Sequence, residues 1–296
     1  MIRGSMPYLS FRRLCKRRSN RKLSMGLYSL MLAEIVLMAI AAVAQQSPKA
    51  TDQPAQAPDA PIANPGRPTV STPATLTPSG YFQFESGVLS AWTSPEFSSQ
   101  TSISEVVKFA VSRRIELLAG IEPVAHSRVG VQSSNNAGGV SLGVQTVLFP
   151  GEGSKPTISG SYFHTVYAGN APDLDIGSST NSVLLLASAD VRKFHYDANL
   201  FFNELVNDPI RRSQFGQSLS VSHSLTTRFG LSGEIWHFTQ PFLRGNAVGN
   251  LLGLSYTATK DLVFDAGFDR GLTNTSTQWE VFAGFTYLVP HRMFRH

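Results

Sequence analysis

Seven histidines are the side chains best suited to acid–base or metal chemistry in this sequence, and they are scattered: His126, His164, His195, His223, His237, His291 and His296. His223 lies between Ser222 and Ser224, but adjacent residues of a strand point to opposite faces, which prevents a direct Ser–His pair. No stretch matches a zinc helix, a phosphate loop or a nucleophile elbow. We therefore predict no enzyme, no metal site and no cofactor, and an outer-membrane lipid hydrolase is the least favoured alternative.

A second set of chemically active side chains consists of acids and bases that fall on one register of segments with alternating polarity. Only 15% of the residues are charged, which is low for a soluble domain, where about 25% is usual. Charges that face lipid are costly, so we expect this register to face a lumen. Its members are Glu85, Lys108, Arg114, Glu116, Asp190, Asp197, Arg228, Glu234, Asp265 and Glu280.

Two interpretations of these charges stay open. Opposite charges on neighbouring strands would form ion pairs that fill and rigidify a narrow barrel, which is the favoured interpretation; alternatively, they would line a selectivity path for solutes. Glu234, Asp265 and Glu280 outnumber the nearby base Arg228, which predicts a weak preference for cations. Glu105 is an exception, because it shares its register with apolar neighbours; either the strand slips in register or Glu105 lies near an interface.

The elements that position these residues show a period of two. Residues 196–202 and 262–268 are typical, with apolar and polar or small residues in alternation. Segments of about ten such residues suit strands that cross a bilayer with one face in lipid and one in a wet lumen. An open sheet edge is not tolerated in hydrocarbon, so the pattern predicts an all-β, closed transmembrane antiparallel β-barrel.

The alternation predicts about twelve strands, separated by connections that alternate between short and long. This parity is typical of outer-membrane barrels, with short periplasmic turns, long outer loops and both termini in the periplasm. Ten or fourteen strands remain open. The predicted strands are 81–91, 101–111, 114–122, 139–149, 156–168, 180–191, 195–204, 215–225, 228–238, 247–257, 261–269 and 277–289.

Bulky apolar side chains on the opposite register, such as Phe84, Leu117, Phe264 and Phe285, should face lipid. Aromatic residues concentrate at strand ends, which predicts two girdles at the membrane interfaces. The girdle residues are Phe109, Tyr196, Phe229, Tyr256 and Tyr287 at the turn side and Phe202, Trp236, Phe238 and Trp279 at the loop side.

The N-terminal region has the composition of a secretory leader followed by a linker. Residues 1–44 contain a basic stretch, an apolar run and Ala42-Val43-Ala44, a small-x-small cleavage pattern that favours a signal peptide over a membrane anchor. Residues 45–79 are rich in Pro, Ala and Thr, which predicts a disordered linker. The barrel should then span residues 80–289, with a C-terminal tail over 290–296.

The leader also explains the basic composition. It holds eight of the 25 Lys and Arg residues and one of the 20 acids, so the rest of the chain has a net charge of −2. A nucleic-acid partner is therefore not expected. The only cysteine, Cys15, lies in the leader, so the mature chain should contain neither disulfides nor thiolate–metal sites.

Three segments carry a family resemblance: Arg228 to Trp236, Asp265 to Asn274 with its Gly-Leu-Thr, and Trp279 to Tyr287 with its Ala-Gly. They resemble the closing strands of the outer-membrane transporters named for the meta-pathway of phenol degradation, and the resemblance covers about residues 81–289. The chain departs from that family in Asn135 to Gly139, which has no aspartate, and in the residues after Val289.

The resemblance implies an outer-membrane barrel that passes small solutes, aromatic or hydrophobic compounds among them. Membrane lipid, the barrel-insertion machinery and small solutes are the expected partners. A closed barrel that acts as a structural anchor of the envelope is the alternative from a different class. Inward Phe and Leu side chains favour that alternative to the extent that they close the lumen.

Overall fold

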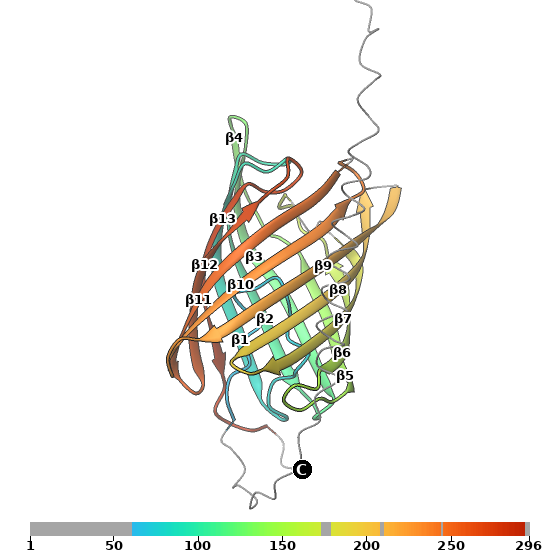
Figure 1. Cartoon of the computed structure of the whole chain (residues 1–296). Helices are drawn as coiled ribbons and strands as arrows, with labels where there is room; N and C mark the ends of the chain where they lie inside the picture. Colours follow the sequence, from blue (N-terminus) through green and yellow to red (C-terminus); the bar gives the residue numbers. More distant parts are fainter. Residues whose placement is uncertain (1–60, 173–178, 208–209, 244, 294–296) are drawn as a thin grey trace, which may run out of the picture. The chain divides into compact units, whose positions relative to one another are not determined.

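The computed structural model describes residues 61–172, 179–207, 210–243 and 245–293, and all regular structure among them is β. Strands consecutive along the chain pair in antiparallel fashion, except that β5 pairs with β3 rather than with β4, and β1 also pairs with the last strand, β13. The additional β2–β3 pairing closes the cylinder seen in Figure 1. No open edge is left in the wall, as a membrane-spanning sheet requires.

Twelve strands form the wall, and β4 only extends the hairpin above β3 (Figure 1). The strands are β1 (Phe82–Trp92), β2 (Ser99–Ala110), β3 (Ile115–Val129), β4 (Gln132–Asn136), β5 (Val140–Phe149), β6 (Thr157–Tyr167), β7 (Ser179–Val191), β8 (Phe194–Asn207), β9 (Ile210–Ser224), β10 (Phe229–Gln240), β11 (Gly245–Thr259), β12 (Leu262–Gly271) and β13 (Trp279–Leu288).

The predicted strand number is therefore confirmed, and the differences lie in the connections. The short turns match, but several long connections are partly strand. Most of the predicted loop 205–214 belongs to β8 and β9, whose pairing continues to Asn207 opposite Ile210. The predicted loop 123–138 contains β4 and the upper part of β3. Hydrogen bonding between neighbouring strands thus continues beyond the apolar stretch that the alternation revealed.

The outer surface of the wall is apolar. Phe84, Leu117, Leu142, Phe202 and Phe264 expose between 42 and 52% of their surface. Large aromatic and aliphatic side chains would not be left in water over such an area, so this surface is suited to lipid. Within the described residues no helix is long and apolar enough to cross a membrane.

Two aromatic residues predicted for the loop-side girdle lie inside the barrel instead. Trp236 and Phe238 expose only 2% and 1% of their surface, and they share the buried register of Glu234. A strand cannot turn Glu234 inward and Trp236 outward, because residues two apart point to the same face. Among the other girdle residues, Phe202, Phe229, Trp279 and Tyr287 are exposed, and Phe109, Tyr196 and Tyr256 are half-buried.

The chain before β1 enters the barrel. Residues 61–80, called the lumen segment below, contact side chains of β1, β3, β5, β6, β7, β8, β9, β10 and β12. Only a chain inside the cylinder can reach strands on all sides of it. The expectation of a disordered linker over 45–79 is corrected for residues 61–79, because backbone groups of this segment are held by polar side chains of the lumen wall. The predicted leader lies outside the described residues.

Both described ends of the chain meet at the turn side of the barrel. The Ala63 N–H donates to the Lys260 carbonyl in the β11–β12 turn, and the Met293 N–H donates to the Gly80 carbonyl. The lumen segment therefore enters and leaves the barrel at the same end.

Candidate functional site: the lumen and its N-terminal segment

The lumen segment forms a loop that rises from the turn side and returns to it. Near its start, the Asn64 N–H donates to Gln83 Oε1 at 2.8 Å, and the Gln83 amide donates back to the Asn64 carbonyl at 2.6 Å. The Asn64 side chain also donates to the Thr75 carbonyl at 2.9 Å, which joins the two arms of the loop. The returning arm ends where the Gly80 N–H donates to the Ala110 carbonyl at the end of β2.

Glu234, in the middle of β10, holds the far end of this loop. Its carboxylate accepts the N–H groups of Val70 and Ser71, each at 2.7 Å, and the Ser71 hydroxyl at 2.6 Å. The Ser71 hydroxyl lies 2.8 Å from that of Ser218 on β9. A charged acceptor with several donors is among the stronger hydrogen-bond arrangements in proteins. Glu234 therefore serves as the principal anchor of the loop.

Arg67 forms a second anchor, on β12, which is separated from β10 by β11 alone. Its guanidinium lies 3.2 Å from the carboxylate of Asp265 on β12. Gly87 on β1 and Gly284 on β13 face each other across the ladder, and a Cβ atom on either would overlap the Arg67 guanidinium. The missing side chains leave a slot in the wall in which Arg67 lies.

A third anchor combines an ion pair with backbone donors. Lys108 on β2 and Glu85 on β1 form a buried ion pair at 2.5 Å, and Glu85 also accepts the Gly66 N–H at 2.9 Å. Glu116 on β3 accepts the Thr77 N–H at 2.9 Å. Buried charges need partners of this kind, because an unpaired one would be strongly destabilising.

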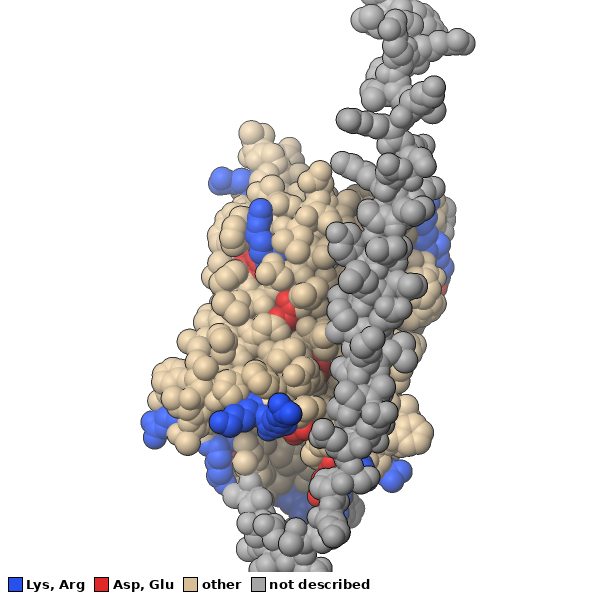
Figure 2. Space-filling model, viewed as in Figure 1, with Lys and Arg blue, Asp and Glu red and all other residues tan. Residues whose placement is uncertain are grey.

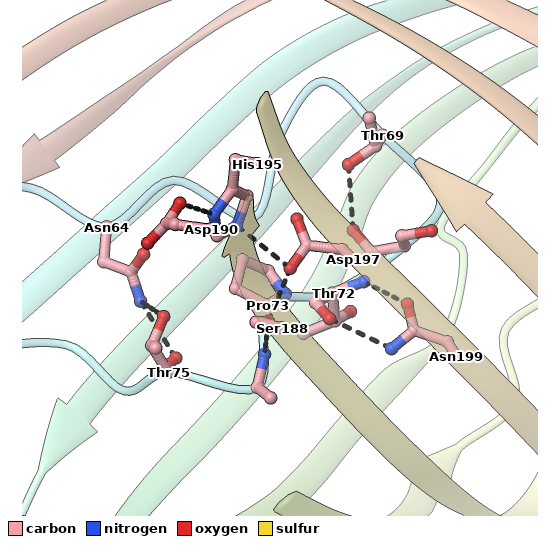
Figure 3. Close-up of polar contacts among 12 residues, drawn as sticks. Asn64, Thr69, Thr72, Pro73, Thr75, Ser188, Asp190, His195, Asp197 and Asn199 are labelled. Atoms are coloured by element: carbon pink, nitrogen blue, oxygen red, sulfur yellow. Dashed lines mark hydrogen bonds and ion pairs between the residues drawn. The ribbon is translucent and has the colours of Figure 1, made fainter. Parts of the chain in front are cut away.

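Uncharged side chains of β7 and β8 complete the contacts with the lumen segment, as Figure 3 shows. Asn199 accepts the Thr72 N–H at 2.9 Å and donates to the Thr72 carbonyl at 3.0 Å. The Ala74 N–H donates to Ser188 Oγ at 2.7 Å, and Ser188 donates to Asp197. His195 then connects Asp197 with Asp190, which lies 2.7 Å from its Nδ1. The chain of contacts links the lumen segment to the mouth of the barrel.

An apolar cluster fills the lumen beside the segment. Leu184, Leu186, Phe201, Trp236 and Phe238 pack together from β7, β8 and β10, with Ala74 of the segment among them. Phe201 and Phe238 are 5.1 Å apart between ring centroids. Trp236 donates its indole N–H to Asp269 at 2.5 Å, which satisfies the polar group of an otherwise apolar side chain. This half of the lumen is therefore packed.

A cavity of about 400 Å³ lies at the wall formed by β2, β3, β5 and β6. Gln100, Val106 and Ser141 line it, together with Gly120 and Gly139. The volume lies within the range of small-molecule sites, about 300–1,000 Å³.

Six of the ten charges predicted for the lumen are buried there: Glu85, Lys108, Glu116, Asp197, Glu234 and Asp265. Asp190, Arg114 and Arg228 are instead exposed at the turn side. Arg114 and Arg228 each precede the first residue of their strand, so they lie in turns rather than in the lumen. Glu280 is half-buried near the loop side of β13.

Glu105 lies on the outer register and is exposed. Its pairing with Ser86 of β1 is regular, so β2 does not slip on that side. The irregularity occurs in the pairing of β2 with β3, between Ile103 and Glu105. Glu105 also lines the cavity, with Ile121 of the same outward register.

The sequence interpretation missed the lumen segment and the uncharged residues that bind it, including Gln83, Asn199 and Ser218. One signal was available: amides and hydroxyls recur on the inward register, and buried polar groups require partners. Gln83, Gln145, Asn199 and Ser218 are each at most 2% exposed. A wall with so many buried amides indicates a second polar element inside the barrel.

The histidines do not assemble a catalytic or metal site among the residues that the structure describes. His223 Nδ1 lies 2.8 Å from the Lys193 carbonyl oxygen rather than beside the hydroxyl of Ser222 or Ser224. It is therefore not placed to act as the base for either serine. The described part of the chain also has no group of three or more His, Cys, Asp or Glu residues that is placed to hold a metal ion.

No family model and no curated protein matches this sequence. Among solved structures, the chain is similar to an outer-membrane channel from Pseudomonas putida F1, with 12% identity, a TM-score of 0.55, and 76% of this chain and 99% of that chain covered. The KdgM porin has 11% identity and a TM-score of 0.46 over 70% of this chain and 98% of that one. The toluene transporter TodX of Pseudomonas putida has 8% identity and a TM-score of 0.41 over 76% and 96%. The first likeness establishes the fold as that of an outer-membrane β-barrel.

Proposed function

We propose that this protein is a passive outer-membrane channel for small solutes, closed at rest by its own lumen segment. The observation that carries the proposal is a closing element attached mainly by hydrogen bonds, in a barrel whose wall also carries a cavity of about 400 Å³. Hydrogen bonds exchange with water at a modest net cost, about 0.5–1.5 kcal/mol each. The segment can therefore leave its seat without unfolding the wall.

The residues that line the cavity indicate the class of solute. Val106, Val140 and Pro172 provide apolar surface, whereas Gln100, Ser141 and the acids Glu105 and Glu122 provide polar groups. Pockets of this composition bind small, partly apolar molecules, with polar groups that fix their orientation. Aromatic compounds belong to this class, which agrees with the family that the closing strands resemble.

The orientation is part of the proposal. We place the short turns, with both described ends of the chain, in the periplasm and the longer connections and the β3–β4 hairpin outside the cell, as is usual for outer-membrane barrels. Insertion would then depend on the periplasmic barrel-insertion machinery.

A closed structural barrel is the second candidate, and the packed half of the lumen favours it. The two candidates are separated by uptake into proteoliposomes, with phenylalanine as a small aromatic zwitterion that crosses lipid slowly. A channel predicts uptake by the wild type well above empty liposomes, and faster uptake by a variant that lacks residues 64–77. A structural barrel predicts the rate of empty liposomes in the wild type. A deletion variant that stays equally impermeable while correctly folded would exclude the channel.

A further inference from the structure

The turn side of the barrel carries an array of basic residues. Arg113 and Arg114 lie in the β2–β3 turn, Lys155 lies in the β5–β6 connection, and Arg192 with Lys193 forms the β7–β8 turn. All five are exposed. None of their side chains takes part in the contacts with the lumen segment described above.

The remaining turns continue the array. Arg228 precedes β10, Lys260 joins β11 to β12, and Arg292 follows β13, and all three are exposed. Each short turn and the C-terminal segment thus supplies at least one base; together these residues are called the turn-side rim. In Figure 2, blue side chains gather at the lower end of the barrel, where Figure 1 shows the short turns.

Nearby acids leave most of this charge uncompensated. Glu152, Asp190 and Asp261 lie at the same end, and Asp190 is engaged with His195. Across residues 61–172, 179–207, 210–243 and 245–293, none of the five ion pairs uses a base of the turn-side rim. The rim therefore presents net positive charge to whatever adjoins it.

Arg192 has a backbone conformation that is uncommon for a residue other than glycine. It occupies the left-handed region with φ of 59°, where Gly or Asn would fit with less strain. A strained residue other than glycine is grounds for a functional hypothesis.

The aromatic residues beside the turn-side rim indicate its level relative to the membrane. Arg228 directly precedes Phe229, which packs with Tyr256 at 5.0 Å between ring centroids. Lys193 directly precedes the exposed Phe194. Aromatic rings of this kind lie at the level of the lipid headgroups. Bases one residue further out reach the headgroup phosphates with their long side chains.

We propose that the turn-side rim is a binding surface for anionic phospholipid headgroups of the adjacent membrane leaflet. The bases are distributed around the whole circumference, which suits a shell of lipids better than one acidic protein. Lys and Arg near a membrane surface attract anionic lipids, and salt screens this attraction.

The test measures which lipids stay bound. Protein is reconstituted in vesicles of equal phosphatidylethanolamine and phosphatidylglycerol, extracted in mild detergent, and its bound lipids are quantified by mass spectrometry. The turn-side variant combines Arg113→Gln, Lys193→Gln and Arg228→Gln. The matched control neutralises three exposed bases of the loop side, Arg128→Gln, Arg211→Gln and Arg212→Gln.

We expect phosphatidylglycerol to be enriched about threefold or more in the wild type and the loop-side control, and enrichment to fall toward one in the turn-side variant. In the wild type, enrichment should also decrease as NaCl is raised, which keeps the test valid if the turn-side variant does not fold. Absent enrichment in the wild type would overturn the proposal, and so would enrichment that survives in the turn-side variant, is lost equally in both variants, or does not respond to salt.

Discussion

Carboxylates on the lumen wall hold backbone N–H groups of a segment that is distant in sequence. Glu234 accepts three donors from Val70 and Ser71, and Asp265 pairs with Arg67. The sequence interpretation assigned Glu234 and Asp265 to the lumen but had no means to identify their partners, because a Pro-rich segment shows no periodicity. Both acids are occupied while the lumen segment is seated. The predicted preference of the lumen for cations therefore applies to the barrel after the lumen segment has left it.

Removing the Glu234 carboxylate should loosen the lumen segment. In a Val70→Cys background, Glu234→Ala leaves the Val70 and Ser71 donors without their acceptor, which costs about 1–3 kcal/mol. We expect maleimide labelling at position 70 to become roughly tenfold faster. Glu105→Ala is the control, because Glu105 is an acid on the outer register. Similar labelling rates in the two variants would show that Glu234 does not anchor the segment.

A second prediction concerns the slot that Gly87 and Gly284 leave for the Arg67 side chain. Gly87→Ala should displace the Arg67 guanidinium from Asp265, since the added Cβ would meet only that side chain. The barrel should still fold, and labelling of Val70→Cys should become several-fold faster. Gly233→Ala is the matched control on β10, because no atom lies within 4 Å of its Cβ position. An unchanged rate in Gly87→Ala would mean that the Arg67–Asp265 contact does not hold the loop.

The strands could be predicted because each has its own alternation of apolar and polar residues, whereas the lumen segment has no such periodicity. Period-two alternation identified the twelve wall strands, and it also sorted Phe264 outward and Asp265 inward. The same rule, applied consistently to β10, would have placed Trp236 beside Glu234 in the lumen rather than in a girdle. The β3–β4 hairpin escaped prediction because its residues, Gln132–Asn136, are polar and exposed on both faces.

The two faces of β12 should respond differently to charge. Phe264 lies on the outer surface opposite Phe285 of β13 and is 45% exposed. Phe264→Arg would place a cation in lipid at a cost of about 2–4 kcal/mol near the midplane. We expect this variant to lose the heat-modifiable gel mobility of a folded barrel in lipid, whereas Asp265→Asn retains it. Folding of both variants to the same yield would contradict the assignment of the outer face.

At the scale of the whole molecule, a complete barrel encloses a segment that precedes its first strand. The β1–β13 and β2–β3 pairings close the wall by themselves, so the lumen segment adds contacts without contributing to the ladder. Its seat includes polar side chains from strands around the lumen, beside a packed apolar cluster. The proposed opening and closure rest on this division between a wall that closes without the segment and a segment held mainly by hydrogen bonds. The signal peptide predicted for residues 1–44 remains a prediction.

The most direct test of this closure is single-channel recording of a barrel whose segment can be locked and released. The Ser71 and Ser218 hydroxyls are 2.8 Å apart, so Ser71→Cys with Ser218→Cys places two thiols in position for a disulfide between segment and wall. The mature chain should contain no other cysteine. We predict that the oxidised variant shows no opening events and that a reductant added to the same bilayer restores them. Equal opening in the oxidised and reduced states would contradict the claim that the lumen segment closes this channel.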